Sequence, residues 1–248
     1  KEYETLYKFM REWVKKKNVS NTRISQKKYG KVENKVKVMN EWEHQMECHR
    51  RVMLRELILI CSNTGIRGPK EILSLTWGDV RVERRMLPGL YNSDKDVESL
   101  VAYINIGEDQ KTGARQVVGL AGAYFARLKQ YYRDEFDYEP KDTDPVFMEM
   151  VGRKKYMPFE RYALYRLWKE LIVAAGLTRI EFTLYCLRGF YITQSILNGV
   201  DVTLIAKNCG NSPSTIYQSY EFINMETNTH NIIKRRDTRK EIDYSVEL

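Results

Sequence analysis

The sequence predicts one mainly α-helical domain with a small antiparallel β-sheet. Three observations support this prediction. Apolar residues recur at helical spacing along most of the chain, two β-prone runs flank one turn near residue 110, and glycines stand where helices should end. The 248 residues fit one large domain, and 43% hydrophobic residues are enough for a buried core. No apolar run approaches the roughly 18 residues that a membrane-spanning helix needs.

Residues 1–40 are expected to form a helix followed by a basic linker. Four apolar residues are spaced for one face of a helix over residues 1–17: Leu6, Met10, Trp13 and Val14. The stretch from 15 to 38 is strongly basic, with Glu33 as its one acidic residue. Its basic residues are Lys15, Lys16, Lys17, Arg23, Lys27, Lys28, Lys31, Lys35 and Lys37. The stretch is either a solvated linker or a strap that contacts phosphates, and deleting residues 1–38 is expected to spare the fold.

Residues 41–248 are expected to form the main domain with a C-terminal tail. The predicted helices span 41–63, 69–77, about 121–134, 159–175 and 183–198, and two short ones begin after Asp201 and Ser212, which suit N-caps. Gly176 and Gly199 stand at expected helix ends. The predicted strands, 101–106 and 115–120, flank a turn at 108–114. Segment 84–100 is predicted to be an insertion or a long loop.

The composition favours a polyanionic partner in a reducing compartment. The net charge is +8 and the isoelectric point is near 9.1, which favours nucleic acid. None of the four cysteines belongs to a C-x-x-C pair, so we expect free thiols in the cytoplasm and no zinc site. His44 and His49 lack the i, i+4 spacing of a helical metal pair and are expected at the surface or in a linker.

Two segments present cations at predicted turns. Thr64-Gly65-Ile66-Arg67 precedes a helix, where an arginine can offer its planar fork to a phosphate. Glu71 follows Arg67 by one helical turn and can hold it in place, although such a pair is usually only a structural ion pair. Lys111 lies at the tip of the predicted hairpin. A lysine there is normally solvated, but it can also give a proton to a departing oxygen in a DNA groove.

Two later segments add an arginine and a tyrosine. Arg188 lies within the apolar run LYCLRGFYIT, where an unpaired charge is costly. It is therefore either part of an anion site or half of a buried ion pair. Cys209-Gly210-Asn211-Ser212-Pro213 is followed by Tyr217 and Tyr220. Either tyrosine alone would usually be a packing residue.

In this order and spacing, the four segments resemble the tyrosine recombinase family, also called phage integrases, over about residues 50–225. TGIRGPKEILSLTWGD resembles the family's first box, T-G-x-R-x-x-E-x-x-x-L-x-W-x-D, with one extra residue between Arg67 and Glu71. KTGARQVVGL fits K-T-x-x-x-R-x-V-P-L, apart from Gly119 in the proline position and a one-residue shift before the valines. YCLRG stands where the family usually has H-x-L-R-H, and CGNSP where it has L-G-H-S-S. The family's nucleophile lies nine residues after that last histidine position, which is Tyr220 here, with Tyr217 as the second candidate.

The resemblance implies a recombinase catalytic fold and a metal-free, cofactor-free cleavage of double-stranded DNA. Its catalytic residues would be Arg67, Lys111, Tyr185, Arg188, Asn211 and Tyr220, with Glu71 supporting Arg67. Tyr220 would attack the phosphate, the arginines would hold its oxygens, and Lys111 would protonate the leaving oxygen. Arg115 and the basic stretch would contact DNA. The family works as a tetramer on two DNA sites, and residues 221–248 could link protomers.

Three histidine positions of the family pattern carry other residues. Tyr185, Gly189 and Asn211 each replace a histidine. Tyrosine and asparagine can still hydrogen-bond a phosphate, but neither is a good general base near neutral pH. Two alternatives therefore stay open beside an active recombinase: a DNA-binding protein whose catalysis is weakened or lost, and a type IB topoisomerase with the same chemistry. A basic helical scaffold without this chemistry would leave the shared register unexplained.

Overall fold

The computed structural model describes residues 1–20, 22–25, 35–87, 96–108, 113–178 and 182–219. Its helices are α1 (Glu2–Trp13), α2 (Glu41–Thr64), α3 (Lys70–Leu73), α4 (Gly122–Phe136), α5 (Arg161–Ala174), α6 (Cys186–Leu197), α7 (Val202–Cys209) and α8 (Pro213–Ser219). Its strands are β1 (Thr22–Ser25), β2 (Lys35–Val38), β3 (Val80–Leu87), β4 (Val97–Ile106) and β5 (Arg115–Gly119). The predicted class, mainly helical with a small antiparallel sheet, is confirmed.

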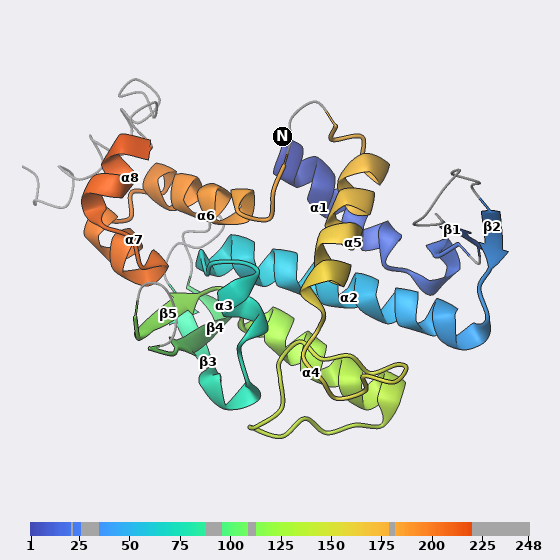
Figure 1. Ribbon diagram of the computed structural model, residues 1–248. Helices are drawn as coiled ribbons and strands as arrows, with labels where there is room; N and C mark the ends of the chain where they lie inside the picture. Colours follow the sequence, from blue (N-terminus) through green and yellow to red (C-terminus); the bar gives the residue numbers. More distant parts are fainter. Residues whose placement is uncertain (21, 26–34, 88–95, 109–112, 179–181, 220–248) are drawn as a thin grey trace, which may run out of the picture.

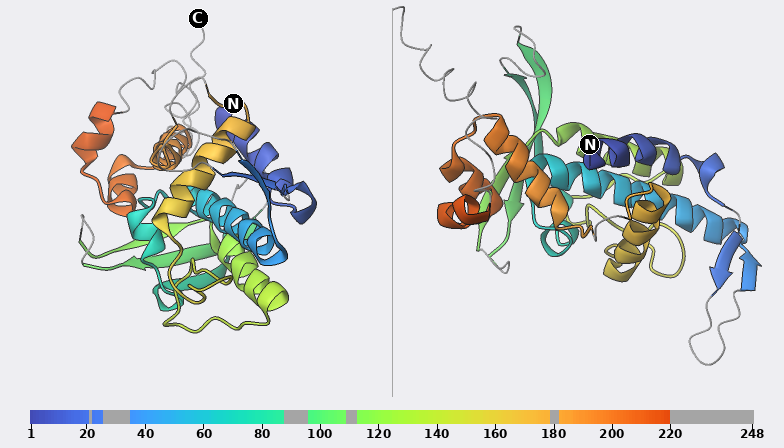
Figure 2. Two further views of the ribbon diagram at one scale, coloured as in Figure 1. Left: turned by 45° about the vertical axis from the view of Figure 1, so that its right-hand side comes forward. Right: turned by 90° about the horizontal axis from the view of Figure 1, so that it is seen from above.

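Helix α2 is the central axis of the molecule (Figure 1). Asn40 begins it through a capping box with Glu43, and Gly65 ends it in the left-handed conformation with φ of 67°. Its 24 residues span about 36 Å at 1.5 Å per residue. Helices α4 and α5 pack along its length. The sheet β3–β5 and helices α6–α8 lie at its C-terminal end, and β1–β2 lies at its N-terminal end (Figures 1 and 2).

Two apolar clusters stabilise the described residues. The main core surrounds α2 and takes side chains from α1, α4, α5, the sheet and the start of α6. A smaller cluster joins the rest of α6 to α7 and α8 through Ile192, Ile205, Ala206, Cys209 and Ile216. The last two helices therefore lie outside the main core, and α7 contacts β5 as well as α6.

The N-terminal prediction is partly right and partly wrong. Helix α1 forms as expected, but its apolar face, including Trp13, is buried in the main core. The expectation that residues 1–38 can be deleted without harm to the fold is therefore wrong. The basic stretch is also not a plain linker, because β1 and β2 pair antiparallel, with Thr22 opposite Val38. The division of the chain at residue 40 stays a prediction.

The segment predicted as a loop contains the end of strand β3 and the start of strand β4. Strands β3 and β4 pair antiparallel from Val80–Ile104 to Leu87–Val97, and β5 pairs with the other edge of β4. Much of β3 is exposed and carries charged residues, so it lacks the apolar alternation that usually identifies a strand. Residues 88–95 and the predicted turn residues 109–112 lie outside the described residues.

The remaining helices form close to their predicted bounds, with two corrections. Pro69 precedes a single helical turn, α3, rather than a helix that continues to Trp77. His49, expected at the surface or in a linker, is buried on α2, where its ring contacts the carbonyl of Met148 at 2.9 Å and the hydroxyl of Tyr131 at 3.3 Å. Burial lowers the pKa of His49 from 6.5 to about 4. A buried helix face, not a metal or a loop, accounts for this residue.

Candidate active site

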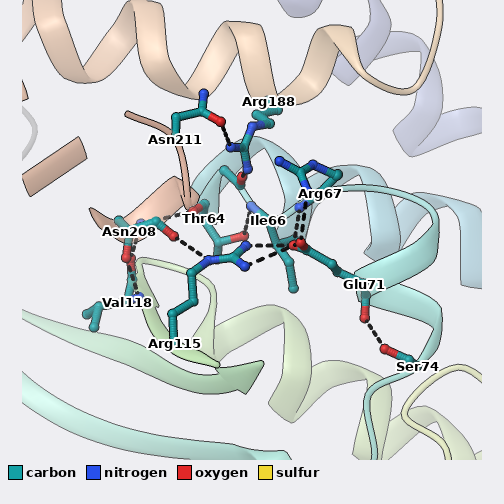
Figure 3. Close-up of polar contacts among 11 residues, drawn as sticks. Thr64, Ile66, Arg67, Glu71, Ser74, Arg115, Val118, Arg188, Asn208 and Asn211 are labelled. Carbon is teal, nitrogen blue, oxygen red and sulfur yellow. Dashed lines mark hydrogen bonds and ion pairs between the residues drawn. The ribbon is translucent and has the colours of Figure 1, made fainter. Parts of the chain in front are cut away.

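Arg67 and Arg188 come from segments far apart in the sequence and meet at the C-terminal end of α2 (Figure 3). Arg67 follows the turn that begins at Gly65. Arg188 lies on α6 and is only 1% exposed. Its Nη1 donates to the carbonyl oxygen of Gly65 at 2.8 Å, and its Nη2 donates to Oδ1 of Asn211 at 2.7 Å. The two family boxes that contain these arginines therefore assemble into one cationic site.

Both guanidinium groups hold a buried nitrogen with no hydrogen-bond acceptor among the described residues. These are Nη1 of Arg67 and Nε of Arg188. Nη1 of Arg67 lies 3.5 Å from Oε1 of Glu71, which is an ionic contact without a hydrogen bond. Burial lowers the pKa of Arg188, and the charge of Arg67 acts in the same direction. Buried donors are almost always satisfied in folded proteins, so this pair is suited to an anion that brings its own oxygens.

Glu71 links two arginines rather than one. Its carboxylate is almost fully buried and accepts from the backbone N–H of Arg67 at 3.0 Å. It also accepts from Arg115 on β5, at 2.6 Å from Nη2 and 3.3 Å from Nη1. The predicted Arg67–Glu71 pair is present, but Arg115 makes the closer contact. Arg115 was expected to contact DNA, and its side chain, 9% exposed, is instead directed at Glu71; a DNA contact from it stays a prediction.

Two glycines let the surrounding elements approach the site. A Cβ on Gly65 would lie 2.4 Å from the ring of Tyr191 and 2.7 Å from Sγ of Cys209. A Cβ on Gly119 would lie 2.3 Å from the carbonyl oxygen of Asn63. Any residue with a side chain, proline included, would separate β5 from the end of α2. This close approach explains why Gly119 stands where the family pattern has proline.

The other predicted catalytic residues have different placements. Asn211 bonds Arg188, as described above. Tyr185 precedes α6 and is 54% exposed. Tyr217 lies on α8 and is 65% exposed. Lys111 and Tyr220 lie outside the described residues; Tyr220 directly follows α8, and Lys111 lies four positions before Arg115. Their roles stay predictions.

Sequence reasoning missed Asn208, which lies directly before the C-G-N-S-P segment. Its side-chain amide contacts the backbone of both Thr64 and Val118. Its backbone carbonyl oxygen accepts from Nε of Arg115 at 3.2 Å. No motif identifies it, because its contacts come from residues 90 and 144 positions away. Only its position beside a recognised segment could have drawn attention to it.

Exposed cations gather at the other end of α2. Lys15 pairs with Glu12, and Lys16 pairs with Glu135 at 2.6 Å. Among the residues predicted to bind DNA, the side chain of Arg23 and the residues Lys27, Lys28 and Lys31 lie outside what the structure describes. Sequence reasoning missed a second basic segment, the exposed turn Arg153-Lys154-Lys155 between α4 and α5. Its neighbour Gly152 lies beside Trp42 at the start of α2.

All four cysteines are free, and no group of three or more His, Cys, Asp and Glu side chains is arranged to hold a metal within the described part of the chain. Burial raises the pKa of the Cys209 thiol to about 11, although Arg188 and Arg115 oppose the shift. The thiol therefore stays protonated near neutral pH. Among the described helices, none is long and apolar enough to cross a membrane.

Comparison with known proteins agrees with this architecture. The model of the phage integrase family matches residues 31–227. Two solved complexes of the XerH site-specific recombinase with difH DNA are similar in fold, both at 19% identity. The pre-cleavage complex has a TM-score of 0.52 and covers 86% of this chain and 47% of XerH. The post-cleavage complex, on palindromic difH, has a TM-score of 0.56 and covers 94% and 52%.

A third solved structure, the XerA recombinase, has 20% identity and a TM-score of 0.49, with 75% of this chain and 57% of that chain covered. The chain thus spans about half the length of the XerH recombinase that it matches. A search of curated proteins by sequence finds no significant match.

Proposed function

Because the chain belongs to the phage integrase family, we propose that it is a site-specific recombinase that cuts and rejoins double-stranded DNA through a 3′-phosphotyrosyl intermediate. The observation that carries this proposal is the meeting of Arg67 and Arg188, each with a buried guanidinium nitrogen that lacks an acceptor among the described residues. A scissile phosphate would supply oxygens to both. Such pre-oriented donors act most strongly on the extra negative charge of the transition state.

Each residue has a distinct part in the proposed reaction. The hydroxyl of Tyr220 gives its proton to solvent and its oxygen attacks the phosphorus. The bond from the phosphorus to the 5′-oxygen breaks, and Lys111 gives that oxygen a proton. Rejoining reverses the step, with a 5′-hydroxyl displacing the tyrosine. Because the phosphodiester energy is kept in the phosphotyrosine, no ATP is needed. Asn211 holds Arg188 in place, and the arginines and Lys111 supply the positive charge that metal ions supply in other phosphoryl-transfer enzymes.

DNA would be held through the exposed cations at the N-terminal end of α2. These are the basic stretch with Lys15, Lys16 and Lys17, and the turn at Arg153-Lys154-Lys155. A homotetramer on two DNA sites is part of the proposal.

A second candidate is a protein that binds DNA but cleaves it slowly or not at all. Two features favour it: Tyr185 is half exposed in the position of a family histidine, and Oδ1 of Asn211 is already engaged by Arg188. Neither residue is a proton acceptor suited to neutral pH.

Covalent trapping tests the proposal. The probe is a pool of nicked suicide duplexes with randomised sequence around the nick, so that no target site needs to be known. We expect a covalent protein–DNA adduct that maps to Tyr220 by peptide mass spectrometry and forms equally in EDTA. Tyr220→Phe should abolish it, while Tyr217→Phe should retain it.

Other results would redirect the proposal. DNA binding without any adduct would favour the second candidate. An adduct on Tyr217 would mean that Tyr217, not Tyr220, is the nucleophile. Loss of the adduct in EDTA would contradict the metal-free mechanism. Relaxation of supercoiled plasmid at many sequences would indicate a topoisomerase instead.

A further inference from the structure

Helices α7 and α8 form a unit that must be held in place relative to the arginines. The unit includes Asn211 in its connecting turn and ends at Ser219, directly before Tyr220. Its apolar side chains pack with α6 in the small cluster, apart from the main core. Apolar packing thus joins the unit to α6, with Sγ of Cys209 also beside Gly65 at the end of α2, and side-chain hydrogen bonds add to its placement against β5 and α2.

The side chain of Asn208 on α7 makes those contacts (Figure 3). Its Oδ1 accepts from the backbone N–H of Val118 on β5 at 2.7 Å. Its Nδ2 lies 3.1 Å from the carbonyl oxygen of Val118 and 3.0 Å from that of Thr64 at the end of α2. Nδ2 also lies 2.9 Å from the hydroxyl of Tyr191 on α6. One amide therefore joins four elements that surround the site.

The contact with Val118 works as a strand pairing. β5 is an edge strand, because the sheet order is β3-β4-β5. Val118 lies opposite Tyr103 of β4, yet both its N–H and its carbonyl are bound by Asn208 on the other side. A side-chain amide has the same donor and acceptor as a peptide group, so Asn208 covers the open edge as one more strand residue would.

We propose that Asn208 is a positioning residue that clasps the α7–α8 unit to β5 and to the end of α2. The inference rests on the proposed function, which gives the placement of the α7–α8 unit a purpose. By holding this unit, Asn208 positions the segment before Tyr220 relative to Arg67 and to the strand that follows Lys111. Asn208 does not itself touch the DNA phosphate. Asparagine suits the place because the carbonyls of Thr64 and Val118 need donors while the N–H of Val118 needs an acceptor.

Hydrogen exchange followed by mass spectrometry tests the clasp without relying on activity. In Asn208→Ala, peptides covering β5 and α7–α8 should exchange faster, on the order of tenfold at the Val118 amide, because one hydrogen bond is removed. Peptides of α4 and α5 should be unchanged. Asn208→Asp should have a larger effect, since a carboxylate cannot donate and would face two carbonyl oxygens. Asn105→Ala, at an exposed asparagine of β4, is the matched control and should change nothing outside β4 and β5.

Single-turnover cleavage then tests the role in the reaction. At saturating DNA, Asn208→Ala should cleave roughly a hundredfold more slowly while its affinity for DNA stays that of wild type, because misplacement of a reacting group slows chemistry without removing a contact to substrate. A merely structural residue would lower stability and affinity together. Asn208→Ser, which keeps one hydroxyl, should retain part of the rate and serves if the alanine variant does not fold.

The outcomes separate the two proposals. Unchanged exchange in β5 and α7–α8, or equally faster exchange throughout the chain, would overturn the clasp. Local exchange that responds as expected, in a wild-type protein that traps no DNA, would overturn the proposed recombinase activity and leave the clasp standing. Cleavage at the wild-type rate in Asn208→Ala would overturn the role in catalysis.

Discussion

The two ends of helix α2 both gather positive charge, but in opposite ways. At the C-terminal end, Arg67 and Arg188 are largely or fully buried. The carbonyl of Gly65 and the side chain of Asn211 orient Arg188, and Glu71 lies 3.5 Å from Arg67. Toward the N-terminal end, Lys15 and Lys16 are exposed and have only surface ion pairs. The first arrangement fixes a few donors in space, whereas the second leaves long side chains free to move.

Under the proposed function, the difference would correspond to two tasks in handling a polyanion. Stabilising a transition state needs donors that are already in place and shielded from water. Attracting a duplex needs only charge near its backbone, and exposed lysines provide it at little cost in ordering. Substitutions should therefore have different effects at the two ends. Those at the C-terminal end should lower stability or the cleavage rate, and those at the N-terminal end should change only the salt-dependent binding of DNA.

The largest effect is expected from removing the buried carboxylate. Glu71→Ala leaves Arg115 and Arg67 without their shared partner, and breaking a buried pair costs about 3–5 kcal/mol of unfolding free energy. Urea denaturation measures it. The control is Glu98→Ala, which breaks the exposed Arg84–Glu98 pair and should cost less than about 1 kcal/mol. Equal losses in both variants would mean that the buried contacts of Glu71 contribute no more to stability than the exposed Arg84–Glu98 pair.

Arg188→Ala should come next, with a loss of cleavage rate on the order of 10² or more, as for other transition-state donors that are removed. Single-turnover trapping at saturating DNA measures it. Arg188→Lys should restore little, because one ammonium group cannot replace the fork that reaches both Gly65 and Asn211. For contrast, Arg153→Ala at the other end should weaken binding and leave the saturated rate nearly unchanged. A rate loss of similar size there would remove the distinction between the two ends.

Acid should destabilise the N-terminal half of α2 through His49. Its pKa falls from 6.5 to about 4 on folding, so between these values the unfolded state binds more protons. Stability is therefore lost as the pH drops through this window, by about 2 kcal/mol at pH 5 at 1.36 kcal/mol per unit. Denaturation at pH 7 and pH 5 measures the loss, and His49→Gln should reduce it while His44→Gln should not. An equal loss of stability in the wild type and in both variants would mean that a group other than His49 binds the proton.

The smallest effect on stability is expected at the basic turn. Replacing Arg153, Lys154 and Lys155 together by alanine should change unfolding free energy by no more than about 0.5 kcal/mol for each substitution. On duplex DNA, however, the slope of log affinity against log salt should flatten by about 0.9 for each phosphate that the turn no longer neutralises. Binding at four salt concentrations measures the slope. An unchanged slope would mean that DNA does not reach this turn.

Much of the fold and the outline of the site could be predicted because their signals are local. The capping box at Asn40, the glycines after α5 and α6, and the apolar spacing of α1 each act within a few residues, and these helices form near their predicted bounds. The exposed strand β3 was missed because its charged surface carries no periodic apolar signal.

The sequence by itself determined the family and indicated Arg67 and Arg188 as candidate site residues, since both conclusions depend on residue types at fixed spacing within short segments. Only the tertiary structure decided what those residues contact. Glu71 binds Arg115 more closely than Arg67, Asn208 caps the edge of β5, and His49 is buried against Met148. Each contact joins residues that are 44, 90 or 99 positions apart. Hydrogen bonds and burial at such separations depend on how whole elements pack, and no local pattern of residue types encodes them.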